Sequence, residues 1–265
     1  MSDINTTVDG VRAIEMRYRA IWSSAEKLPA FYQSSIRLNS PDMGVLLPEQ
    51  FMPVIEADDR CISIFRLALL QTVKAAEKFN DRGLDFDWVS VFIPQMLLGK
   101  SNCVKTVRDF TAKIEAIPQG ICFELPESVL ADSGSCESIK QLRKAGYHIM
   151  LTGVDSERFP LFRLAELEPE YVMLNESITR RLGKDYDTDS CISTLTSFIS
   201  GLGAETIAAG VSSAEEANEL SGLAARISQA VKTECFRANL YQTGLSAGKI
   251  RHRTIHRNNI MSITG

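Results

Sequence analysis

The sequence has no long uninterrupted apolar segment and no paired-cysteine motif. Its 265 residues include three histidines and six cysteines, and no apolar run approaches the roughly 18 residues expected of a membrane helix. The first residues are polar and carry acids, which is wrong for a signal peptide. We therefore expect a cytoplasmic protein without a membrane segment, whose cysteines are reduced and mostly buried.

The common phosphate-loop and zinc motifs are also missing. No GxGxxG follows the first predicted strand, and GxxxxGK[ST] occurs nowhere. His252 and His256 lie four residues apart, but without the glutamate of an HExxH motif. We expect His148, in a predicted strand, to be a core residue. Dinucleotide-loop, P-loop and zinc-hydrolase chemistry are therefore unsupported.

Charge is unevenly distributed along the chain. The formal net charge is −4, yet the last 31 residues, from Cys235 to Gly265, hold five basic residues and no acid. The preceding residues therefore carry −4 − 5 = −9. An acidic body with a short basic tail is not typical of a nucleic-acid-binding protein, so we do not expect nucleic acid as a partner. The basic stretch from Lys249 to Arg257 is expected to be a solvated extension.

Strand-like and helix-like patterns alternate along most of the chain. Asp132 or Ser133, and Ser212 or Ser213, are predicted helix N-caps, and Gly146 suits a left-handed helix end. Strands are predicted at 13–22, 30–37, 88–93, 121–125, 147–151, 171–174 and 206–209, and helices around 62–76 and at 104–117, 135–145, 191–202 and 213–223. This alternation predicts an α/β fold with parallel strands, either a barrel or an open doubly wound sheet.

The segment from Pro41 to Glu56 resembles the EAL-domain signature HPxxGxxxPxxFIPxAE. Six of its positions agree in register: Pro41, Gly44, Pro48, Phe51, Pro53 and Glu56. Further landmarks of the family follow in the right order. They are Tyr18–Ile21 for YQPI, Phe123–Glu127 for LEITE, Leu142–Gly146 for LRxLG, Pro169–Asn175 for PxDxLKID and Ile207–Val211 for VAEGVE.

This resemblance to the cyclic di-GMP phosphodiesterase family covers roughly Ala13 to Val231. It implies a modified (β/α)8 barrel of the TIM type, with the first strand antiparallel and the site at the C-terminal strand ends. The domain boundaries that follow are an N-terminal extension at 1–12, a barrel at 13–234 and a basic C-terminal extension at 235–265. A homodimer is expected from the resemblance alone.

The family's chemistry, as the resemblance implies, uses two Mg²⁺ or Mn²⁺ ions, which need converging carboxylates. Glu124 retains one of these acids, and Asp155 falls two to three places beyond the paired aspartates of the family. The other family-site positions are occupied by Gln33, Phe92, Thr152, Gly153, Met173, Asn175 and Ala209. One carboxylate does not hold two hydrated dications, so we expect no metal, no cofactor and no phosphodiesterase activity.

Some residues that the resemblance assigns to the dinucleotide are retained. Arg37 stands where the family places a phosphate-contacting arginine, and Arg19 adds a second cation. The complete set of candidate ligand contacts is Arg19, Arg37, Pro53, Glu56, Glu124 and Gln229.

Three functions remain open at this stage. The first is a catalytically inactive regulatory protein that binds another protein in cyclic di-GMP-linked control of motility, biofilm or transcription. The second is a metal-independent receptor for cyclic di-GMP. The third is an unrelated α/β-barrel enzyme with Glu124 and Glu127 as an acid–base pair, which is disfavoured because residues three apart on one strand face opposite sides.

Overall fold

A curved sheet of nine strands organises the chain in this computed structural model. The structure describes residues 7–8, 11–12, 14–23, 28–40, 42–55, 60–154, 161–181, 184, 186–211 and 231–235. The strands are β3 (Ile14–Ser23), β4 (Pro29–Ser40), β5 (Gly44–Leu46), β6 (Trp88–Phe92), β7 (Ile121–Pro126), β8 (His148–Val154), β9 (Tyr171–Leu174), β10 (Glu205–Val211) and β11 (Val231–Cys235). A separate hairpin joins β1 (Thr7–Val8) to β2 (Val11–Arg12).

The sheet follows the order β3-β11-β10-β9-β8-β7-β6-β4-β5, and β3 also pairs with β4. Apart from β5, the strands therefore form a closed circuit of pairings. β3 is antiparallel to both β4 and β11, whereas the neighbouring pairs from β4 through β6 to β11 are parallel. The predicted α/β barrel with an antiparallel first strand is confirmed.

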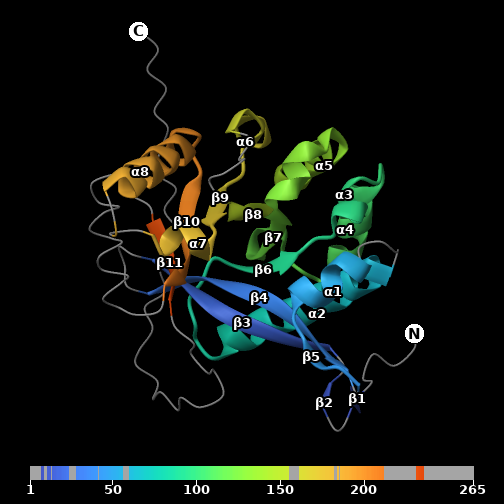
Figure 1. Cartoon of the computed structure of the whole chain (residues 1–265). Helices are drawn as coiled ribbons and strands as arrows, with labels where there is room; N and C mark the ends of the chain where they lie inside the picture. Colours follow the sequence, from blue (N-terminus) through green and yellow to red (C-terminus); the bar gives the residue numbers. More distant parts are fainter. Residues whose placement is uncertain are drawn as a thin grey trace.

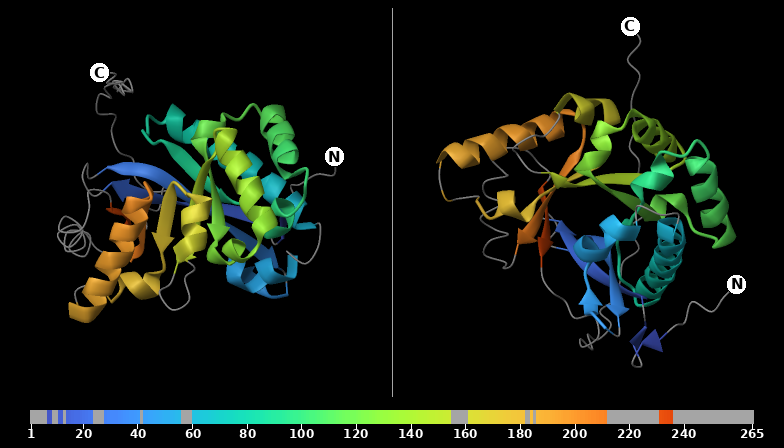
Figure 2. Two further views of the ribbon diagram at one scale, coloured as in Figure 1. Left: turned by 90° about the horizontal axis from the view of Figure 1, so that it is seen from above. Right: turned by 45° about the vertical axis from the view of Figure 1, so that its right-hand side comes forward.

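Helices lie around the outside of this sheet (Figures 1 and 2). They are α1 (Pro48–Ile55), α2 (Arg60–Asp81), α3 (Gln95–Leu98), α4 (Cys103–Lys113), α5 (Ser133–Lys144), α6 (Leu161–Leu167), α7 (Glu176–Thr179) and α8 (Tyr186–Gly201), with 3-10 turns η1 (Pro118–Gly120) and η2 (Glu127–Ala131). No helix in the described ranges combines the length and the apolar character that a membrane crossing requires.

The predicted helix signals are confirmed where they can be compared. The carboxylate of Asp132 accepts hydrogen bonds from the backbone N–H groups of Gly134 and Ser135 at the start of α5. Gly146, just past that helix, has φ +95°, the left-handed conformation that glycine tolerates best. The predicted helix at 213–223 and its cap lie outside the described residues.

The lower half of the barrel interior is filled by aromatic and aliphatic side chains. The rings of Phe31 and Trp88 stack 3.9 Å apart at 6°, and the Tyr171 ring meets Trp88 edge-on at 4.9 Å. Met150 and Ile207 pack in the same cluster. Because this plug closes the N-terminal end of the parallel strands, a ligand site in the barrel has to lie at the other end.

Cys61, Cys103, Cys122, Cys136 and Cys191 form no disulfide. Cys61, Cys103 and Cys122 are buried, as expected, whereas Cys191 on α8 is exposed. Burial raises the pKa of the Cys103 thiol to about 11, and burial with the nearby charges of Glu124 and Glu170 raises the pKa of the Cys122 thiol well above its ordinary value. The thiols of Cys103 and Cys122 are therefore protonated and unreactive at neutral pH.

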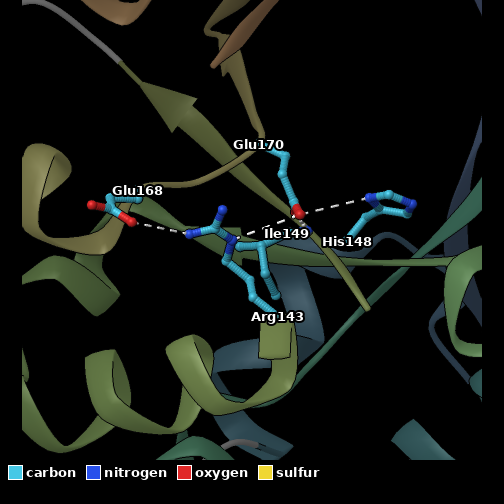
Figure 3. Close-up of polar contacts among 5 residues, drawn as sticks. All are labelled: Arg143, His148, Ile149, Glu168 and Glu170. Carbon is cyan, nitrogen blue, oxygen red and sulfur yellow. Dashed lines mark hydrogen bonds and ion pairs between the residues drawn. The ribbon is translucent and has the colours of Figure 1, made fainter. Parts of the chain in front are cut away.

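A partly buried ion-pair network joins β8 and β9 at the barrel floor (Figure 3). Glu170 accepts a 2.7 Å hydrogen bond from the backbone N–H of Ile149, and its carboxylate lies 3.7 Å from Arg143 Nε and 3.8 Å from His148 Nδ1. Burial alone would raise the pKa of Glu170, but the contacts with His148, the Ile149 amide and the Arg143 charge together lower it. His148 is thus a floor residue, remote from the mouth.

Replacing Glu170 with glutamine is expected to destabilise the protein at pH 7 by about 1 kcal/mol, since the network is half exposed to water. A carboxyl group whose pKa is lower in the folded than in the unfolded state stabilises the folded protein at pH values above its unfolded-state pKa. That stabilisation is lost as the pH falls through its folded-state pKa. The difference between the variant and the parent in urea unfolding should therefore begin to shrink below about pH 4.3, the ordinary glutamate pKa, and vanish below the lowered folded-state pKa of Glu170. Glu166→Gln, in an exposed pair with Arg163, is the matched control. A gap that persists in acid would contradict this role.

Candidate functional site

Glu124 lies on β7 with its carboxylate inside the barrel, above the aromatic plug. Its Oε2 accepts a 3.1 Å hydrogen bond from Nε2 of Gln33 on β4, and its Oε1 accepts a short hydrogen bond from the hydroxyl of Ser90 on β6. The same Gln33 nitrogen lies 3.8 Å from Sδ of Met173 on β9. Side chains from four strands therefore meet at this point.

This arrangement supplies donors to one carboxylate instead of oxygen ligands to a cation. The amide nitrogen of Gln33 and the hydroxyl of Ser90 each direct a proton at Glu124. Hard divalent cations require oxygen ligands, and a bound cation would face these same donor groups. Within the described ranges, no three His, Cys, Asp or Glu side chains lie close enough together to hold a metal ion. The residues described do not fit a two-cation centre.

Ser90 was missed in the sequence because it lies within an apolar run. The backbone N–H of Ser34 donates to its hydroxyl at 3.3 Å, and that hydroxyl donates to Glu124. Backbone pairing between β4 and β6 is confined to Phe31–Trp88 and Tyr32–Val89. Ser90 thus links the two strands just beyond the point where their pairing ends.

The end of β8 carries Thr152 and Gly153, which the sequence resemblance aligned with the family's paired acids. Thr152 Oγ1 donates to the carbonyl oxygen of Leu125 at 3.2 Å, so its hydroxyl supports the sheet. Gly153 has φ +75°, and the β8–β9 register shifts between Leu151 and Val154. A bulge therefore redirects the chain at this point. Asp155 lies outside the described residues.

The corresponding positions on β9 and β10 also have local structural tasks. Asn175 Oδ1 accepts a 2.9 Å hydrogen bond from the Ser177 N–H and so caps α7. Ala209 packs beside the inner cluster. Gly210 has φ +79°, and a Cβ there would overlap the side chain of Glu176. Glycine is therefore required where α7 closes over β10.

Phe92 packs toward the helices that cover the sheet. Its ring lies 6.3 Å from that of Phe65 on α2, at 74°, and it packs against the large core cluster. Phe92 is therefore a core-filling residue at the end of β6.

Strand pairing places a row of arginines on the face that continues from Gln33. Arg19 lies opposite Gln33 and Arg17 opposite Ser35, while Arg37 lies opposite Glu15. Opposite residues in an antiparallel pair share a face, as do residues two apart on one strand. The face therefore carries three arginines and one glutamate. Arg17 was missed because the sequence alone does not fix this register.

Two of these arginines differ in how their charge is paired. Arg17 Nε lies 3.0 Å from Glu15 Oε1. The guanidinium of Arg37 has no ion-pair partner among the described residues. Positive charge is therefore in excess on this face.

The remaining candidates are more scattered. Pro53 is exposed on α1, and Glu56 and Gln229 lie outside the described residues. Glu127 lies in η2, beyond the end of β7, so the opposite-faces argument from a shared strand does not apply. Glu124 accepts hydrogen bonds from Gln33 and Ser90.

The chain belongs to the EAL domain family, whose model matches residues 5–229. It is 23% identical over 186 residues to the cyclic di-GMP phosphodiesterase PdeR of Escherichia coli K12, and 23% identical over 195 residues to RocR of Pseudomonas aeruginosa, also a cyclic di-GMP phosphodiesterase. These alignments cover 69% and 73% of this chain but only 28% and 50% of the relatives.

Solved structures agree on the fold. The EAL enzyme Bd1971, with cAMP and cyclic di-GMP bound, superposes with a TM-score of 0.73 and 21% identity. The superposition covers 84% of this chain and 61% of that one. The chain is therefore an EAL domain in sequence and in architecture.

The Gln33–Glu124 contact can be tested by Gln33→Glu, which sets two carboxylates against each other. We expect a loss of about 1–3 kcal/mol in the free energy of unfolding at pH 7, because a buried donor is replaced by a like charge. The loss should shrink as acid protonates one of the pair. Gln141→Glu is the matched control, since Gln141 Nε2 donates to Glu137 at 2.9 Å on the exposed side of α5. An equal loss in both variants would contradict the assignment.

Proposed function

We propose that this EAL domain is a regulatory protein that does not hydrolyse cyclic di-GMP and acts by binding another protein in cyclic di-GMP-linked control, of motility, biofilm or transcription. The relatives that it matches are named phosphodiesterases. The proposal rests on the positions where this chain differs from the signature of that family.

One observation carries the proposal: Gln33 donates to Glu124 at the place where the family needs acids. Catalysis by metal ions depends on a bound water whose pKa falls from 15.7 to about 7, and that water needs a held cation. Glu124 accepts hydrogen bonds from the Gln33 amide and the Ser90 hydroxyl, and the same amide nitrogen lies beside the Met173 thioether. At the other positions, Thr152 and Asn175 bond to the backbone.

Purified protein is therefore expected to leave cyclic di-GMP intact in the presence of Mg²⁺ or Mn²⁺. Product formation is followed by chromatography, with RocR as the positive control under identical conditions. Hydrolysis that scales with the concentration of this protein would refute the proposal. A fraction that hydrolyses only before a further purification step would indicate a contaminant, so activity and protein must co-elute for a refutation.

A second function, a metal-independent receptor for cyclic di-GMP, is favoured by the arginine row. Arg17, Arg19 and Arg37 share the face that leads from Gln33. Guanidinium groups bind phosphates through paired hydrogen bonds, and this does not require a metal. The excess positive charge beside the strand ends suits a dianionic ligand.

If this second function holds, calorimetry without metal should show binding, and Arg37→Ala should weaken it roughly tenfold, equivalent to about 1.4 kcal/mol. Arg163→Ala removes an arginine from α6, whose ion pair with Glu166 is exposed, and serves as the control. Adding Mg²⁺ should leave the affinity unchanged. Absence of heat at high ligand concentration would rule the receptor out.

A further inference from the structure

We propose that the outer edge of β5 binds an acidic protein segment in an extended conformation, whose apolar side chains alternate with its acids. The inference deepens the protein-binding role proposed above and rests on it. The surface consists of β5, the residues on either side of it, and the arginines of β3 and β4. We call it the β5 edge, defined by Met43, Val45, Leu47 and Arg37.

The first observation is that β5 ends the sheet. It pairs with β4 through Leu38–Leu46, Asn39–Val45 and Ser40–Gly44. Among the described residues, no strand pairs with its other side. β4 continues to Ser40, so β3, β4 and β5 extend beyond the barrel, with α1 and α2 beside them (Figure 1). An open strand edge presents backbone N–H and C=O groups that can bind an added strand.

The second observation is a row of exposed apolar side chains along this edge. Met43, Val45 and Leu47 are 68%, 50% and 45% exposed. Val45 lies within β5, and Met43 and Leu47 flank the strand on either side, so the three exposed side chains follow one another along the edge. Edge strands are usually protected by a charged side chain or a proline, and this row has neither within it. The row therefore provides contacts for alternate apolar side chains of a bound strand.

The third observation decides the charge of the partner. Val45 lies opposite Asn39, so Val45, at the centre of the row, shares its face with Arg37, which is two residues before Asn39 on β4. Arg37 has no ion-pair partner in the described part of the chain. Arg17 and Arg19 continue the positive charge on β3. A segment with carboxylates between its apolar residues matches both properties.

A second copy of this chain fits the surface less well. Two β5 edges related by a twofold axis would place Val45 against Val45, with Met43 against Leu47. This pairing brings no carboxylate to Arg37, because the row itself is uncharged. Three strand residues on each side also give a small contact compared with the roughly 800 Å² per partner of a stable interface. The charges therefore favour a different, acidic partner.

The test uses a short fluorescent peptide of alternating glutamate and valine, with a lysine–valine peptide as its charge-reversed counterpart. Fluorescence anisotropy with the full chain should show binding of the acidic peptide only. Val45→Asp and Arg37→Glu should each weaken that binding at least about tenfold. Ile117→Asp, at an apolar residue 71% exposed between α4 and η1, should leave it unchanged. Circular dichroism establishes that each variant is folded.

Equal binding of both peptides, or binding that Val45→Asp leaves intact, would overturn the docking site. So would a dimer in analytical ultracentrifugation that Val45→Asp dissociates, since that assigns the edge to a second copy. Hydrolysis of cyclic di-GMP is measured on the same samples. Hydrolysis together with peptide binding contradicts the proposed function alone, whereas no hydrolysis and no peptide binding contradicts the β5 edge alone.

Discussion

The upper half of this barrel depends on how the carboxylate of Glu124 is compensated. A charged group in a protein interior is costly unless hydrogen bonds or opposite charges surround it. In this chain the hydrogen bonds come from Gln33 on β4 and from Ser90 on β6. Backbone pairing between β4 and β6 is confined to two residue pairs. The hydrogen bonds that compensate the charge of Glu124 therefore also connect two strands that share little backbone pairing.

The other positions that the resemblance assigned to the site also have contacts within the fold. Thr152 bonds to the adjacent strand, and Asn175 caps a helix. Met173 fills space between Gln33 and the inner cluster. A cluster of acids without metal ions would repel itself, and these uncharged side chains avoid that repulsion, which is consistent with the proposed absence of catalysis.

The sequence predicted the repetitive parts of the fold and missed what depends on register. Apolar runs marked β6 to β10 because strands buried on both faces have little polar content. β5 and α1 escaped detection because a three-residue strand has no measurable period, and α1 contains Pro53. Ser90 was hidden in such an apolar run. Arg17 could be assigned to the row of arginines only once the pairing with β4 placed it opposite Ser35.

The two ends of the barrel are built for different purposes, and this separation supports a role in binding. At the floor, Glu170 is held by Arg143, His148 and a backbone amide, so its charge is satisfied internally. At the mouth, β4 continues past its last pairing with β6 and carries Arg37 outward without an ion-pair partner in the described chain. Charge that the fold does not neutralise is available to a partner. Because Val45, at the centre of the apolar row, lies on the same face, this end of the molecule combines charge, apolar contact and open backbone groups on one surface.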